Sequence, residues 1–147
     1  MPLTELNHYF VRAKDLERSR RFYCDALGFE VMPRPTLAFP GYWLGVNGKV
    51  QVHMGPDGIA DESRHYMGTT PGCARDNAGV VDHIAFQGTD PGSVARRLSE
   101  LGLPSRTRHL QEIELLQIFV ADPDGLTIEL NFPGVPVLPA WAQRALS

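Results

Sequence analysis

The chain has 147 residues, of which 43% are hydrophobic and 21% charged, and its formal net charge is -3. This composition suits one globular domain, and the charge excludes an electrostatic attraction to nucleic acid or to an anionic membrane. No segment approaches the ~18 apolar residues of a membrane span, and the amino terminus does not resemble a signal peptide. We therefore expect a cytoplasmic protein whose two cysteines, Cys24 and Cys73, are reduced.

The first half of the chain predicts the element order βαβββ. Residues 6–11 have strand character and are followed by Asp15, a residue suited to a helix N-cap. Gly28 closes the predicted helix in the C′ position. Three strands follow, two of them separated by the Asn47-Gly48 hairpin signal; they are predicted at residues 29–32, 39–46 and 50–54.

Residues 55–79 are rich in Gly, Asp, Ser and Thr and show no clear period. We interpret them as a crossover loop between the two halves. Long loops in compact domains are usually functional or mobile. His65, Tyr66 and Met67 lie in this loop and could cover a cavity as a lid. The alternative, a surface loop with a solvated histidine, is the more common one.

The second half repeats the same order. Asp90-Pro91 is typical of a helix start, and Gly102 ends that helix. Residues 122–125, Asp-Pro-Asp-Gly, predict a turn. Trp141 and Leu146 belong to a short helical tail and should dock on this subunit or on a neighbour. The strands of this half are predicted at residues 80–87, 103–110, 114–121 and 126–132.

The two halves also repeat their chemistry-bearing residues, and such self-similarity indicates a duplicated unit. His8 and His83 both lie in the first strand of their half, and each is followed at the same interval by an aspartate, Asp15 or Asp90. The last strands carry a second matched pair, with His53 in the first half and Glu129 in the second. Two pairs of residues thus occupy equivalent positions.

The residue types of these pairs favour a metal site. Side chains two apart in a strand share a face, so Glu129 should lie with Thr127 and Asn131 on the concave face of a curved sheet. Imidazole together with carboxylate suits Fe, Zn, Ni, Co or Mn, whereas Mg and Ca prefer oxygen ligands. His65 and His109 lack a repeat partner and are expected to be ordinary hydrogen-bonded or solvated histidines.

Several segments resemble the vicinal oxygen chelate superfamily, which includes glyoxalase I, bleomycin resistance proteins and extradiol dioxygenases. The similar segments are Asn7-His8-Tyr9, the Leu-Glu-Arg-Ser-Arg-Arg-Phe-Tyr-Cys-Asp-Ala-Leu-Gly-Phe-Glu run of the first helix, Val81-Asp-His-Ile-Ala-Phe86 and Phe119-Val-Ala-Asp-Pro-Asp-Gly-Leu-Thr-Ile-Glu-Leu-Asn131. The resemblance covers nearly the whole chain except the crossover loop and the tail. Its Asp-Pro-Asp-Gly…Glu ending is specific for the superfamily but not for one reaction.

The resemblance implies an α+β fold in which two βαβββ modules form a curved, cleft-like barrel of mixed sheets with helices outside. The modules would be residues 1–54 and 80–132 of one structural domain, with the crossover loop at 55–79 and the tail at 133–147. A homodimer that acts on a small molecule is the usual arrangement. Carried over by position, the resemblance gives the following divalent-metal ligands: His8, His83, Glu129 and, at the position that varies among relatives, His53.

Whether His53 binds the metal decides which reaction is possible. If His53 binds the metal, two open positions remain for a substrate with two neighbouring oxygens, and proton transfer by a lyase or isomerase follows, with His53 and Glu129 as the catalytic residues. If His53 stands off, three open positions favour an Fe(II)-dependent ring-cleaving dioxygenase with His53 as acid or base. A non-catalytic small-molecule binding or resistance protein is the third possibility. Candidate cleft-lining residues are Phe39, Tyr42, Trp43, Gln117 and Phe119.

Overall fold

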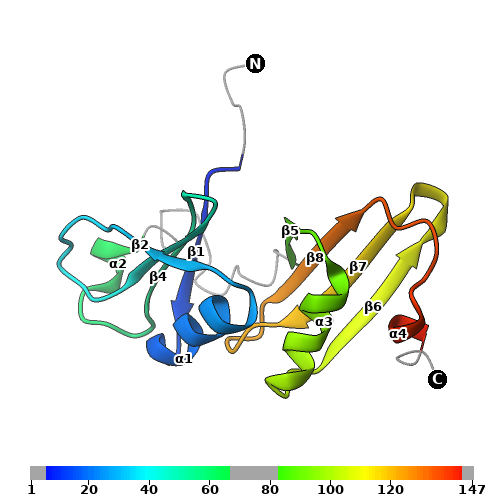
Figure 1. Cartoon of the computed structure of the whole chain (residues 1–147). Coiled ribbons are helices and arrows are strands. Elements are labelled where there is room, and N and C mark those ends of the chain that lie inside the picture. Colours follow the sequence, from blue (N-terminus) through cyan, green and yellow to red (C-terminus); the bar gives the residue numbers. More distant parts are fainter. Residues whose placement is uncertain (1–5, 67–82, 144–147) are drawn as a thin grey trace. The chain divides into compact units, whose positions relative to one another are not determined.

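A computed structural model describes residues 6–66 and 83–143 of the chain. The chain forms two compact units, Met1–Ala78 and Gly79–Ser147, and each is described by itself (Figure 1). The main elements of the first unit are β1 (Tyr9–Ala13), α1 (Leu16–Arg21), β2 (Glu30–Met32), β3 (Tyr42–Val46) and β4 (Lys49–Pro56). Those of the second unit are β5 (His83–Gln87), α3 (Pro91–Glu100), β6 (Ser105–Leu110), β7 (Leu115–Ala121) and β8 (Thr127–Pro133).

The predicted duplication is confirmed by the topology of the two sheets. The strand orders are β1-β4-β3-β2 and β5-β8-β7-β6, which are the same order in equivalent elements. In each sheet the first strand runs parallel to the last, and the other neighbours are antiparallel. The α+β class is therefore confirmed. Each described sheet is open, with two edge strands, and does not close on itself into a barrel.

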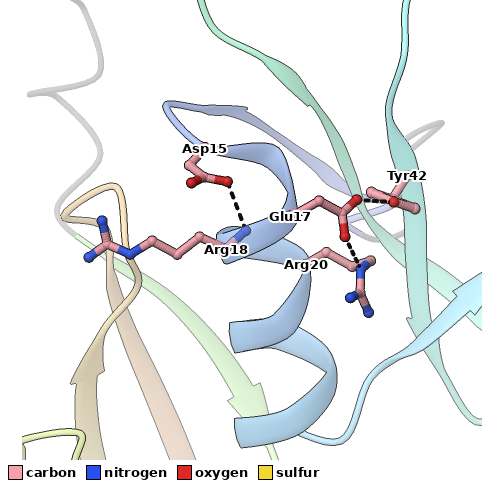
Figure 2. Close-up of polar contacts among 5 residues, drawn as sticks. All are labelled: Asp15, Glu17, Arg18, Arg20 and Tyr42. Atoms are coloured by element: carbon pink, nitrogen blue, oxygen red, sulfur yellow. Dashed lines mark hydrogen bonds and ion pairs between the residues drawn. The ribbon is translucent and has the colours of Figure 1, made fainter.

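The first helix begins as predicted and ends differently. The Asp15 carboxylate accepts a hydrogen bond of 3.1 Å from the backbone N–H of Arg18, which caps α1 (Figure 2). After Arg21 the helix widens into a π-helical segment, η1 (Phe22–Ala26), which buries Phe22 and Tyr23. Gly28 follows with a φ of 77°, the left-handed conformation expected of a C′ glycine.

Strand boundaries differ from the prediction where prolines and turns intervene. β3 begins at Tyr42 instead of residue 39, two residues after Pro40, which has no N–H to donate to a sheet. The Asn47-Gly48 turn is confirmed, since both residues have positive φ angles of 53° and 74°. β1 begins at Tyr9, so His8 precedes this strand instead of lying within it.

The start of the predicted crossover belongs to the first unit. β4 continues to Pro56, and a short helix, α2 (Glu62–His65), follows. Tyr66 is only 4% exposed, and its hydroxyl donates a 2.6 Å hydrogen bond to the Pro56 carbonyl. The prediction that the crossover loop begins at residue 55 is therefore corrected, because this part contains the end of a strand and a short helix. Met67, the third residue of the predicted lid, lies outside the described residues.

The second unit has the helix cap and the turn that the sequence predicted. Asp90 caps α3 by accepting from the Ser93 N–H at 3.3 Å, and the helix lies against the second sheet (Figure 1). Asp122 closes the predicted turn by accepting from the N–H groups of Asp124 and Leu126 at 2.9 and 2.8 Å. The tail helix is described as α4 (Ala140–Gln143), and Leu146, the last residue of the predicted helical stretch, lies beyond the described residues.

Two short helical elements complete the described chain. A 3-10 turn, η4 (Gln111–Ile113), connects β6 to β7. In α4, Trp141 lies near Gly92 at the start of α3, which is the docking on this chain that the sequence suggested. No helix among the described residues is both long and apolar enough to cross a membrane.

Candidate functional site

In the first unit, β1 and β4 bring two of the predicted metal-ligating histidines together. His53 lies in β4 and is paired in the backbone register with Phe10 of β1, two residues beyond His8. The imidazole rings of His8 and His53 stack with their centroids 3.7 Å apart and their planes inclined by 18°. The His8 side chain is exposed, and its Nδ1 lies 2.7 Å from the Asn7 side-chain oxygen.

Trp43 of β3 lies on the other side of the His53 ring. Its indole stacks on the imidazole with 4.2 Å between ring centroids and 4° between the planes. Behind His53, Val52 and Met54 are almost fully buried, as the strand alternation predicted. The His53 imidazole is thus held between two rings on the face opposite to the core.

The surroundings of His53 favour its neutral form. Burial is the largest cause, and repulsion from His8 and from Arg34 adds to it, so that the pKa of His53 falls from its usual 6.5 to about 4. A neutral imidazole has a lone pair available to accept a proton or to bind a metal ion. Its position therefore suits either of the roles that the sequence left open for His53.

An aromatic group borders this face. Tyr66 contacts Phe10 and Phe39, with ring centroids 4.7 and 5.1 Å apart. Arg34 lies over the Phe39 ring at 5.0 Å and donates a 2.9 Å hydrogen bond to the Phe39 carbonyl. Residues 34–40 line a shallow hollow, so Phe39 remains a candidate for contact with a ligand.

Tyr42 does not belong to the face that carries His53. Its hydroxyl donates a hydrogen bond to the Glu17 carboxylate of α1 (Figure 2). Arg20 donates to the same carboxylate at 2.9 Å. Tyr42, one of the candidate cleft-lining residues, therefore lies on the other face of the sheet from Trp43, because adjacent residues of a strand point to opposite faces.

In the second unit, Glu129 is part of a hydrogen-bond network. The Gln117 side-chain amide donates to Glu129 and, at 3.0 Å, to Asn131. Gln117 in turn accepts a 2.7 Å hydrogen bond from Nε of Arg108. Glu129 and Gln117 are 7% and 3% exposed. The expected common face of Glu129 and Asn131 is thus confirmed, since one amide reaches both side chains.

Each candidate ligand of a last strand has an aromatic residue as its cross-strand neighbour. Phe119 of β7 is paired with Glu129 of β8, just as Trp43 is paired with His53. His83 is the first residue of β5 and is paired in the backbone register with Thr127, two residues before Glu129. Its backbone position matches that of the predicted ligand, while its side chain lies outside what the structure describes.

The two remaining described histidines have local contacts. His109 lies 2.7 Å from the Val135 carbonyl through its Nε2, which confirms the expectation of an ordinary hydrogen-bonded histidine. The His65 ring lies 5.5 Å from that of Phe39. Arg106 and Arg108 are further candidate residues that were not predicted, although their alternation in Ser105-Arg-Thr-Arg108 indicates that both share a face.

The donor types fit a transition metal, but the candidate ligands lie in two separately described units. Within residues 6–66 and 83–143 no group of three or more His, Cys, Asp or Glu side chains is arranged to hold a metal ion. His8 and His53 form one pair, and Glu129 and the His83 position form the equivalent pair of the second unit. His8 and His53 could each hold an ion through a ring nitrogen, and the two rings would then not keep the stacked arrangement.

The two modules have the same strand order. Each also pairs a candidate ligand with an aromatic residue at the equivalent place, His53 with Trp43 and Glu129 with Phe119. The protein is therefore built by duplication of a βαβββ module. The model of the Glyoxalase/Bleomycin resistance protein/Dioxygenase superfamily matches residues 5–130. The chain belongs to this superfamily.

Similar proteins agree with this assignment. The chain is 34% identical to "Glyoxylase I 4" of Arabidopsis thaliana over 99% of its own length and 80% of that protein. It is 31% identical to "Probable lactoylglutathione lyase" of Synechocystis sp. over 85% of this chain and 92% of that one. The crystal structure of lactoylglutathione lyase from Agrobacterium tumefaciens has the same fold, with a TM-score of 0.63 and 17% identity over 90% of this chain and 96% of that one.

Proposed function

We propose that the protein is a metal-dependent lyase or isomerase that binds a small substrate through two neighbouring oxygens, as the names of its relatives suggest. The observation that carries the proposal is that His8, which precedes β1, and His53 of β4 lie side by side, with their ring centroids 3.7 Å apart. The equivalent positions in the second unit hold a buried carboxylate, Glu129, and His83.

In this proposal the divalent ion is bound by His8, His53, His83 and Glu129. Three imidazoles and a carboxylate suit Fe, Zn, Ni, Co or Mn. When bound, the ion would act as a Lewis acid on the oxyanion that develops on the substrate. The His8 side chain is exposed and would have to leave its contacts with Asn7 and His53 to turn toward an ion, whereas the stacked Trp43 keeps His53 in place.

The residues of this chain would transfer the proton, orient the ligands and contact the substrate. His53 and Glu129 are the candidate proton-transfer groups, because one is a neutral imidazole and the other a carboxylate, and each could take up a proton only at an atom that is not bound to the ion. Gln117 orients Glu129 through the hydrogen bond to its carboxylate. Trp43 and Phe119 lie beside the two proton-transfer groups and would supply apolar walls for the substrate. We also propose that the protein acts as a homodimer.

Metal content and turnover together test the proposal. The protein would be purified under anaerobic conditions, analysed for metal and assayed with lactoylglutathione. We expect His8→Ala, His83→Ala and Glu129→Ala each to weaken metal binding more than ~100-fold, because the remaining groups no longer enclose the ion. His65→Ala serves as the control and should retain metal, since His65 is in no candidate ligand pair.

His53→Gln distinguishes the two catalytic classes. As a direct ligand, His53 should be needed for turnover, and the glutamine variant should retain metal only weakly. Full metal occupancy in any of the alanine variants after dialysis against a mild chelator would remove that residue from the ligand set. Turnover that consumes dioxygen would replace the lyase assignment with the dioxygenase.

A further inference from the structure

Two arginines of the second unit lie against one aromatic ring. Arg106 and Arg108 alternate along β6, and their guanidinium carbons lie 5.4 and 5.5 Å from the centroid of the Phe119 ring. Both arginines are exposed. Residues two apart in a strand are about 6.5 Å apart, so two positive charges are held together on one patch of the sheet. We call Arg106, Arg108 and Phe119 the arginine patch.

The guanidinium of Arg108 is oriented by the sheet. Its Nε donates to Gln117, whose amide is fixed by Glu129 and Asn131. This leaves the two terminal nitrogens of Arg108 directed away from that bond. Arg106 makes its contact with the Phe119 ring. Within the part of the chain that the structure describes, neither guanidinium has an acidic side chain within 4 Å.

The charge of this face favours an anion. Glu129 is the carboxylate nearest to the arginine patch in the backbone register, where it is paired with Phe119, and it already accepts from Gln117. Two guanidinium groups thus lie over one aromatic ring, with one carboxylate paired to that ring's residue, and binding of an anion would reduce the repulsion between the two positive charges. Both arginines are exposed, so an anion from solution can reach the patch.

We propose that Arg106 and Arg108 form a binding site for a carboxylate group of the substrate. A carboxylate is planar and presents two acceptor oxygens, which match the paired N–H groups of a guanidinium. The Phe119 ring supplies an apolar floor under the adjoining carbons. This assignment rests on the proposed function, because the pairing of Phe119 with Glu129 places the site beside a proposed metal ligand.

Binding of small anions to the full-length, zinc-loaded protein tests the site. The arginine Nε signals would be followed by NMR during titration with succinate, with inorganic phosphate and with succinamide, the neutral analogue. We expect succinate to shift the Arg106 and Arg108 signals to saturation and succinamide to leave them unchanged. Because a guanidinium–carboxylate bond is charge-assisted, the R106Q/R108Q double variant should bind succinate at least ~10-fold more weakly.

Three variants sharpen the result. Arg96→Gln removes the same charge from α3 of the same unit and should bind succinate like the parent. R106K/R108K keeps the charges without the planar fork and should show intermediate affinity. Arg106→Gln alone leaves the Gln117 bond to Arg108 intact, so it reports on the site even if the double variant fails to fold.

Four results would contradict either the carboxylate site or the proposed function. Equal binding of succinamide, or an affinity of the double variant within ~2-fold of the parent, would show that the arginine patch binds no anion. Phosphate binding more than ~10-fold tighter than succinate would replace the carboxylate with a phosphate group. The titration is repeated after removal of the metal. Succinate binding in a protein that has no lyase turnover would reject the proposed function and retain the site.

Discussion

The indole of Trp43 lies flat on the imidazole of His53, with 4.2 Å between the ring centroids and 4° between the ring planes. This contact joins a residue of β3 to a proposed metal ligand of β4, which are direct cross-strand partners. Such close stacking restricts rotation of the imidazole. Trp43 is therefore both a positioning residue for His53 and a fluorescent reporter placed directly beside the proposed metal site.

We predict that nickel binding changes the fluorescence of the protein through Trp43. In Trp43→Phe this change should disappear. In Trp141→Phe, which keeps Trp43 and removes the tryptophan of the tail helix, it should persist. A fluorescence titration of the metal-free protein with nickel makes the measurement. If Trp43→Phe kept the parent's fluorescence change and Trp141→Phe lost it, the ion would lie away from His53.

Gln117→Leu should impair both stability and metal binding. The substitution removes the donor to a nearly buried carboxylate, Glu129, and loss of a buried hydrogen-bond partner costs about 1–3 kcal/mol. If Glu129 binds a metal, loss of the residue that orients it should also weaken metal affinity by ~10-fold to ~100-fold. Chemical denaturation and metal titration measure the two effects.

Asn131→Ala provides the matched control for Gln117→Leu. It removes the other acceptor of the Gln117 amide and leaves the bond to Glu129 in place. We expect its metal affinity to stay close to that of the parent. A similar loss of affinity in both variants would mean that the effect comes from general damage to the sheet and not from the orientation of Glu129.

The contact between α1 and β3 should stabilise the protein in a pH-dependent way. The hydrogen bond from Tyr42, followed by that from Arg20, lowers the pKa of Glu17 below its usual 4.5 (Figure 2). The same bond to Glu17 raises the pKa of Tyr42 above its usual 10. A lowered carboxyl pKa contributes stability that is present above 4.5 and is lost as the pH falls through the folded-state value.

We therefore predict that Tyr42→Phe is less stable than the parent at pH 7, and that the difference shrinks below pH 4.5 as Glu17 becomes protonated. The stability provided by the raised pKa of Tyr42 is present below pH 10 and is lost above it. Denaturation curves from pH 7 to pH 2 give the profile. Tyr9→Phe removes a 2.9 Å bond between two tyrosine hydroxyls and should show no such change in acid.

The sequence by itself determined the duplicated plan of this protein. Asp15 and Asp90 predicted the helix starts, Asn47-Gly48 predicted the hairpin, and the alternation around His53 and Glu129 predicted which neighbours share their face. These features depend on local physical chemistry. Capping, turn geometry and the two-residue period of a strand act over a few residues, so they can be recognised without knowing the partners of a segment.

The tertiary structure decided which side chains meet. The stacking of Trp43 on His53, the Gln117 bond to Glu129 and the contact of Tyr42 with Glu17 each join different elements of the chain. Such contacts depend on strand register and on how a helix packs on its sheet, and a shift of one residue would turn each strand side chain to the other face. Register is set by pairing between segments that are distant in sequence, so no local pattern could have identified these partners.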